Sequence, residues 1–188
     1  MADNRLTKFK VELLRWPSED DLLWCKRCCL NTVGKDSIKA PTDEWLRRLV
    51  EAEHSPIREL WFGVRMEIPY WVSVHFVRHH IGVSHYVQSQ RNDRQDDYDR
   101  DAARQDETVS HIMSVNAQEL IFMAHKRLCS QASPETRAVM RAICDAVTEK
   151  APYMRGALVP LCEYRNGRCT EMFPCPRAKS FERKGKEE

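Results

Sequence analysis

The sequence VRHHIGVSHYVQSQR holds the densest group of potential ligand-binding side chains in the chain. Arg78, His79 and His80 stand together, and such a cluster suits phosphates and the carbonyl-rich edge of a cofactor ring, because arginine offers a planar fork of N–H groups. If the end of the run is extended, Ser89 and Arg91 point the same way and form a hydroxyl-plus-guanidinium pair suited to a phosphate. The residues alone leave an alternative open, in which the arginines are surface ion-pair partners and the histidines are ordinary polar residues.

A second candidate lies on the helix that the pattern predicts over Val115–Leu128. Eleven residues rotate a helix by about 1100°, which is about 20° from full alignment, so Asn116 and Arg127 share a face, roughly 16 Å apart. A ligand along this face would meet an amide at one end and a guanidinium at the other. Alternatively, Leu120 and Met123 belong to a core stripe and the polar residues face solvent.

The junction His54-Ser55-Pro56 is a third, weaker candidate. It separates a helical pattern from a strand pattern, and junction loops often hold sites.

The elements that must position these residues follow from periodicity and from Pro and cap signals. We expect strands over Lys8–Leu14 and Leu60–Ile68, and helices over Leu22–Leu30, after a Thr42 cap, over Tyr70–Val77, Val115–Leu128 and Glu135–Lys150. The polar run Arg91–Glu107 reads as a loop, and Ala151–Pro176 as irregular structure. The predicted fold class is α/β (α+β), a single compact domain over residues 1–176 with a mixed or antiparallel sheet flanked by helices. Residues 177–188 form a charged tail that we expect to fray.

Composition narrows the functional classes. The 188 residues are 42% hydrophobic, so the chain can bury a core, and 30 basic against 28 acidic residues give a formal charge of +2. This balance argues against nucleic acid or a membrane surface as the main partner. The sequence shows neither a membrane-spanning run nor a signal-peptide pattern, so we expect a cytoplasmic protein.

Eight cysteines are many for this length, and in a reducing compartment thiols or metal ligands are the candidates. One group is the CKRCC run, and a second is formed by Cys162, Cys169 and Cys175. A zinc site joining the two groups is one interpretation, and reduced, partly buried thiols are the other. Cys129 and Cys144 are predicted to be core thiols. No residue is assigned to a metal.

Taken together, the three candidate segments resemble one family, the flavin-dependent thymidylate synthases. That family carries Arg-His-Arg, seven residues, then Ser-x-Arg. A His-x-Thr/Ser-Pro junction leading into a strand precedes this signature, and an Asn-x-Arg helix with a later Arg follows it. Here HSPIRELWFGVRMEI, FVRHHIGVSHYVQSQR and NAQELIFMAHKRLCSQAS occur in that order, over roughly residues 54 to 133.

The resemblance implies roles for individual residues. Those expected to hold FAD are Arg78, His79, His80, Ser55 and Asn116. Those expected to hold dUMP are Ser89 and Arg91 at the phosphate, with His75 and Arg127 beside the base. Arg127 and Ser89 are the expected catalytic residues.

The family's reaction is the reductive methylation of dUMP to dTMP, with methylenetetrahydrofolate and NADPH as co-substrates and reduced FAD as the hydride donor. Its sites are built between subunits of a homotetramer, so the resemblance implies a homo-oligomer here.

This sequence departs from the family signature at several positions. His80 replaces its second arginine, one residue is inserted before Ser89, and Gln118 and Phe122 replace polar family residues. The stretch before Asn116 is short, so one phosphate-binding arginine lacks a match; the candidates are Arg94, Arg100 and Arg104. These departures leave two alternatives open: a related flavin enzyme that makes another C5-modified deoxyuridylate, and a non-catalytic nucleotide- or nucleic-acid-binding module with a zinc-held tail.

Overall fold

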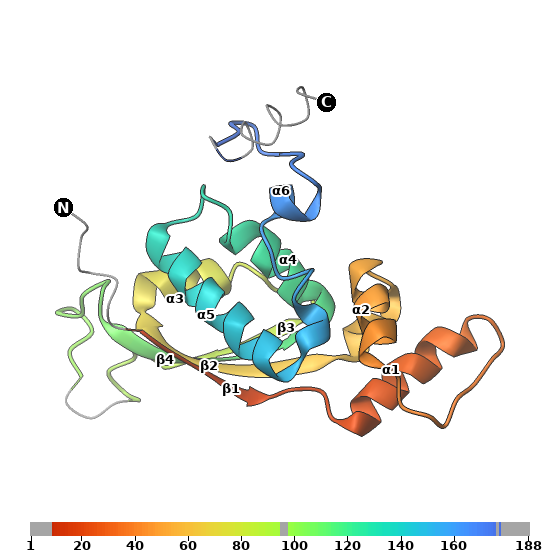
Figure 1. Ribbon diagram of the computed structural model, residues 1–188. Coiled ribbons are helices and arrows are strands. Elements are labelled where there is room, and N and C mark those ends of the chain that lie inside the picture. Colours follow the sequence, from red (N-terminus) through yellow and green to blue (C-terminus); the bar gives the residue numbers. More distant parts are fainter. Residues whose placement is uncertain (1–8, 95–97, 176, 178–188) are drawn as a thin grey trace.

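The computed structural model describes residues 9–94, 98–175 and 177, and its centre is one antiparallel sheet (Figure 1). The strands are β1 (Lys10–Arg15), β2 (Trp61–Pro69), β3 (Val83–Val87) and β4 (Thr108–Asn116), in the order β1-β2-β4-β3. In the long central pair β2–β4, Trp61 lies opposite Asn116, and the register continues without interruption to the other end, where Pro69 faces Thr108. The predicted α/β (α+β) class with a mixed or antiparallel sheet is confirmed, and the sheet is antiparallel throughout its described strands.

Helices cover one face of the sheet and one end of it (Figure 1). The described residues form α1 (Glu19–Asn31), α2 (Asp43–Glu51), α3 (Tyr70–Phe76), α4 (Ala117–Arg127), α5 (Pro134–Lys150) and α6 (Leu161–Tyr164), with short 3-10 turns η2 (Ser55–Glu59) and η3 (Pro152–Met154). Helices α3, α4 and α5 lie over the sheet, whereas α1 and α2 lie beyond the end of β2. No helix in the described part of the chain is long and apolar enough to cross a membrane.

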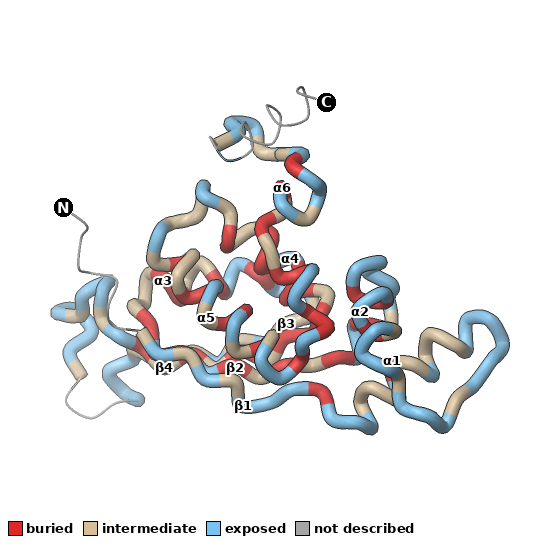
Figure 2. Tube along the Cα trace, viewed as in Figure 1, coloured by how far each residue is buried: buried red, intermediate tan, exposed pale blue. Residues whose placement is uncertain are grey.

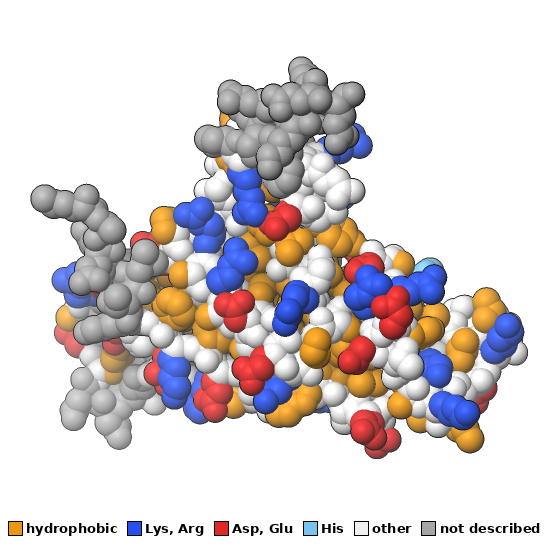
Figure 3. Space-filling view, in the orientation of Figure 1, with side chains coloured by type: hydrophobic (Ala, Val, Ile, Leu, Met, Phe, Trp, Pro, Cys, Tyr) orange, Lys and Arg blue, Asp and Glu red, His pale blue; other side chains and the backbone are white. Residues whose placement is uncertain are grey.

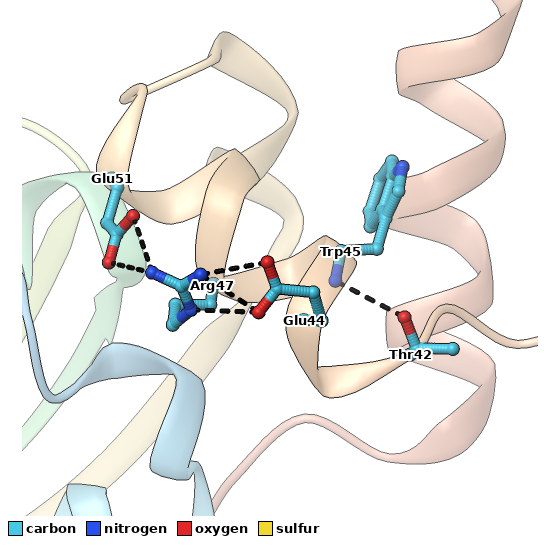
Figure 4. Close-up of polar contacts among 5 residues, drawn as sticks. All are labelled: Thr42, Glu44, Trp45, Arg47 and Glu51. Carbon is cyan, nitrogen blue, oxygen red and sulfur yellow. Dashed lines mark hydrogen bonds and ion pairs between the residues drawn. The ribbon is translucent and has the colours of Figure 1, made fainter.

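Side-chain hydrogen bonds fix several helix starts. Ser18 and Asp21 form a reciprocal capping box at α1, and Thr42 Oγ1 accepts the backbone N–H of Trp45 at α2. Figure 4 shows this cap together with Arg47, which forms ion pairs with Glu44 one turn before it and Glu51 one turn after it. These ion pairs are exposed, so each stabilises the helix by only about 0.3–0.5 kcal/mol.

The core lies between the sheet and the covering helices (Figure 2). Alternate residues of β2 point into it: Phe62, Val64, Met66 and Ile68 are all buried. The opposite face carries charged residues such as Arg65 and Glu67, as the two-residue period of a strand requires. On the face shown in Figure 3, positive and negative side chains are interspersed, in keeping with the nearly balanced charge.

The sequence predictions were right for most elements and wrong around β4. The strand expected over Leu60–Ile68 and the helix over Tyr70–Val77 are confirmed by β2 and α3. The helix expected from Val115 starts two residues later, because Thr108–Asn116 is a strand that the pattern analysis did not predict. Strand β3 was not predicted either. Within the charged tail only residue 177 is described, so its expected fraying lies outside the described residues.

Candidate functional site

A hydrogen-bonded chain of three side chains, buried at His79 and Glu119 and half-buried at Arg127, links the segment after α3 to helix α4. His79 Nδ1 lies 2.7 Å from Glu119 Oε1, and Arg127 Nε donates to His79 Nε2 at 3.0 Å. His79 is 5% exposed and Glu119 is 9% exposed. Glu119 and Arg127 are eight residues apart on α4, so both lie on the face that meets His79.

The hydrogen bonds determine the tautomer of His79. An arginine N–H can only donate, so His79 Nε2 must accept and is unprotonated. The ring proton then sits on Nδ1 and is donated to the Glu119 carboxylate. His79 is therefore held neutral, and Arg127 is held by its Nε while its terminal amino groups stay available for a ligand.

These residues line a cavity with an excess of positive charge. Its walls are Arg78, His79, His80, Ile81, Glu119, Phe122, Lys126 and Arg127. Burial, and next the neighbouring Arg78, lower the pKa of the Arg127 guanidinium, although arginine stays protonated in proteins. In the described part of the chain, neither Arg78 nor Arg127 forms an ion pair with a carboxylate. Two mutually repelling guanidinium groups favour an anionic ligand between them.

A second cavity adjoins the first along α4 and shares Ile81, Glu119 and Phe122 with it. It adds Arg58, Asn116 and Gln118 among others, and Arg58 Nε donates to Gln118 Oε1. The two cavities together form a continuous recess along one side of α4.

Asn116 and Gly82 form a tight junction in this recess. Asn116 caps α4 through its Oδ1, which accepts the Glu119 backbone N–H at 3.0 Å, and its own N–H donates to the Gly82 carbonyl at 2.9 Å. Gly82 has φ +73°, and a Cβ there would lie 2.6 Å from Asn116 Nδ2. Only glycine combines that φ with so close an approach.

His75 lies near the same charges without lining either cavity. Its Nδ1 is 2.7 Å from Thr136 Oγ1, and burial first, then Arg127 and Arg78, lower its pKa. Because both arginines contribute to lowering the pKa of His75, its ring lies close enough to interact with their charges.

The structure does not bring every expected residue into the recess. Arg91 is exposed and pairs with Asp93, with contacts of 2.8 and 2.6 Å, and its backbone N–H donates to Ser89 Oγ. Ser55 opens the η2 turn. None of Ser55, Ser89, Arg91 and His75 lines either of the two cavities.

Sequence reasoning missed Glu119 and Lys126 as members of the site. Glu119 lies three residues after the Asn116 cap, which is the spacing of a capping box, so a carboxylate there reads as part of the helix start. In the structure the carboxylate instead reaches His79. The signal that could have found Glu119 is that a buried histidine needs a partner for each ring nitrogen.

The two cysteine groups lie in different places. The Cys25 thiol is buried and donates to the Pro56 carbonyl at 3.2 Å, and Cys28 lines a cavity with Trp24 at α1. The second group lies near α6 and lines another cavity. The two groups line different cavities, and among the described residues no group of three or more His, Cys, Asp or Glu side chains could hold a metal ion. Cys144 is buried as predicted, whereas Cys129 is only half-buried and lines the α6 cavity.

Comparison with known proteins shows a shared fold. The crystal structure of thymidylate synthase X (ThyX) from Helicobacter pylori, determined with FAD and dUMP, matches this chain with a TM-score of 0.63 at 14% sequence identity. The match covers 80% of this chain and 99% of the other. No protein-family model and no curated protein matches the sequence. The likeness therefore establishes a ThyX-like fold.

Proposed function

We propose that this chain is a flavin-dependent thymidylate synthase, which methylates dUMP to dTMP using methylenetetrahydrofolate, reduced FAD and NADPH. The observation that carries the proposal is the Glu119–His79–Arg127 chain beside Arg78 in a recess of a ThyX-like fold. Support also comes from the sequence, because Arg78, His79 and Arg127 fall on the family's Arg-His and helix-arginine positions.

The residues of the recess fit FAD. The cofactor is an anionic dinucleotide with a hydrogen-bonding aromatic ring, and the recess presents the cations Arg78 and Lys126, the imidazoles of His79 and His80, and the exposed ring of Phe122. Because Gly82 has no Cβ, the Asn116 side chain can pack directly against the Gly82 backbone at the recess wall. When bound, reduced FAD supplies the hydride.

The protein's own part in the reaction is binding and electrostatics. Arg127, fixed through its Nε, would aim its remaining N–H groups at the pyrimidine carbonyls and stabilise negative charge as it develops on the ring. Neutral His79 is necessary for this, since a proton on its Nε2 would oppose the Arg127 N–H. Arg78 and Lys126 would offset the phosphate charge of the ligands.

Ser89 and Arg91 would act in a neighbouring copy of the chain. They belong to the expected dUMP phosphate site, but they lie outside the recess of their own chain. Large hydrophobic side chains stand exposed beside the recess and on β3, namely Ile81, Phe122 and Tyr86. Such exposure favours a partner surface, and a homotetramer would cover it and complete each site.

The test is a flavin titration followed by a product assay. We expect purified protein to retain FAD, its absorbance to shift on addition of dUMP, and dUMP, methylenetetrahydrofolate and NADPH to give a product heavier than dUMP by one methylene group. A product with an additional oxygen would indicate hydroxymethylation instead. A chain that takes up no flavin at any concentration would contradict the proposal.

A further inference from the structure

Two histidines on neighbouring strands support the segment that forms one wall of the recess. His85 lies on β3 and His111 on β4, where the register makes them diagonal neighbours on the inward face of the sheet. A hydrogen bond of 2.9 Å joins His85 Nδ1 to His111 Nε2, and His85 Nε2 lies 2.8 Å from the carbonyl oxygen of His79. A side chain of the sheet therefore reaches the backbone of a residue that lines the recess.

The carbonyl group fixes the direction of these hydrogen bonds. A carbonyl oxygen can only accept, so His85 Nε2 carries the ring proton and His85 Nδ1 accepts the His111 Nε2–H. The other ring nitrogen of His111, Nδ1, is then unprotonated, and it has no partner among the described residues. His111 is 0% exposed, and burial lowers the pKa of both rings. Both rings are therefore neutral at pH 7, and neither can turn over without losing a hydrogen bond.

The segment that His85 holds lies outside regular secondary structure. Residues 78–82 connect α3 to β3 and carry side chains of the recess. One end of the segment is fixed where the Gly82 carbonyl accepts the Asn116 N–H at 2.9 Å. At the other end the His79 N–H donates within its own turn, so the hydrogen bond from His85 ties this part of the backbone to the sheet.

We propose that His85 is a positioning residue of the recess, which holds the His79 carbonyl and thereby presents residues 78–80 to the ligand. The inference rests on the proposed function, because FAD is the ligand whose binding it concerns. A ligand binds more weakly when only a fraction of the molecules already has the segment in place. One neutral hydrogen bond shifts such an equilibrium by about 3- to 10-fold. Losing the bond from His85 should raise the Kd for FAD by about the same factor.

Two amide side chains separate the two bonds of His85. In His85→Gln the amide Nε2 occupies nearly the place of the imidazole Nε2, so it can still donate to the His79 carbonyl. In His85→Asn the shorter side chain keeps an acceptor for His111 near the place of Nδ1 but does not reach that carbonyl. Ser84→Ala is the matched control, because Ser84 is the neighbouring residue of β3 and is exposed on the opposite face.

The Kd for FAD is measured by flavin fluorescence, and hydrogen exchange of the amides of residues 77–83 is measured on the whole chain without ligand. We expect His85→Gln and Ser84→Ala to stay within about twofold of the unaltered chain, and His85→Asn to bind FAD about 3- to 10-fold more weakly and to exchange faster by a similar factor. A residue that served only to satisfy His111 would give the reverse order, because His85→Asn preserves that contact.

Equal behaviour of His85→Gln and His85→Asn, or the reverse order, would overturn the proposal. If the unaltered chain takes up no flavin, the proposed function fails, whereas the exchange rates still test the role of His85. The ring-nitrogen chemical shifts of the unaltered chain supply a test that needs no folded variant. They should show His85 protonated on Nε2 and not on Nδ1 at pH 7, and the opposite tautomer would exclude the bond to the His79 carbonyl.

Discussion

Replacing Glu119 tests whether the hydrogen-bonded chain of side chains positions Arg127. In Glu119→Ala the His79 Nδ1–H loses its acceptor, and the ring is free to change tautomer and present an N–H to Arg127. A hydrogen bond to a charged group contributes about 1.5–3 kcal/mol. If that free energy is expressed in the transition state, kcat/KM falls by about 10- to 150-fold, at about 1.36 kcal/mol per factor of ten.

Glu119→Gln should be much milder, because the amide oxygen can still accept the His79 Nδ1–H and keep the tautomer. The assay measures dTMP formation and dUMP affinity, together with the free energy of unfolding in urea. Glu135→Ala is the matched control, since Glu135 also lies in the first turn of a helix and feels the same helix dipole.

A double-mutant cycle separates positioning from a general structural effect. In an Arg127→Lys background the planar Nε–H fork is absent, so Glu119→Ala should cause little further loss of turnover. The reasoning is refuted if Glu119→Ala is as active as Glu135→Ala, or if its loss is equally large in the Arg127→Lys background.

Three further predictions follow from the geometry. Arg127→Ala should abolish turnover and leave the fold intact in circular dichroism, and normal activity would show that this arginine does not face the substrate. Gly82→Ala should lower the free energy of unfolding by about 1–2 kcal/mol more than Gly34→Ala. Both glycines have positive φ, but only at Gly82 would a new Cβ meet a side chain, that of Asn116, at 2.6 Å. Equal losses of stability in urea denaturation would contradict this clash. Burial lowers the pKa of His111 to about 4 from a usual 6.5. The unfolded chain therefore binds the proton at a higher pH than the folded chain does, and stability should fall as pH drops from about 6.5 to about 4. His111→Gln should reduce this pH dependence of the free energy of unfolding in urea titrations, and an unchanged dependence would assign it to other groups.

The sequence was sufficient to predict where Asn116 and Arg127 lie on helix α4. It was insufficient to predict which side chains they and their neighbours contact. Helical periodicity correctly placed Asn116 at one end of α4 and Arg127 at the other, because both positions depend only on local geometry. The Arg91 contact with Asp93 is equally local, yet the two-residue spacing from Ser89 suggested a shared phosphate instead. Spacing gives direction only where the backbone is regular, and β3 ends at Val87, before either residue.

Strand β4 was missed for a different reason. Its inward positions alternate as expected, but one of them is His111, a polar residue that a core-facing strand position seldom holds. His111 is tolerated because its Nε2 lies 2.9 Å from His85 Nδ1, and His85 Nε2 in turn donates to the His79 carbonyl at 2.8 Å. This partner comes from a strand 26 residues earlier, so only the tertiary fold reveals it.

The end of helix α4 lies between two cavities. Its last turn carries Arg127 on the side of the anion-binding recess, and Cys129 follows within two residues on the side of the α6 cavity. Lys126 spans both, since it lines the recess while pairing with Glu171 of the segment after α6. A nucleotide phosphate that attracts Lys126 would therefore compete with Glu171.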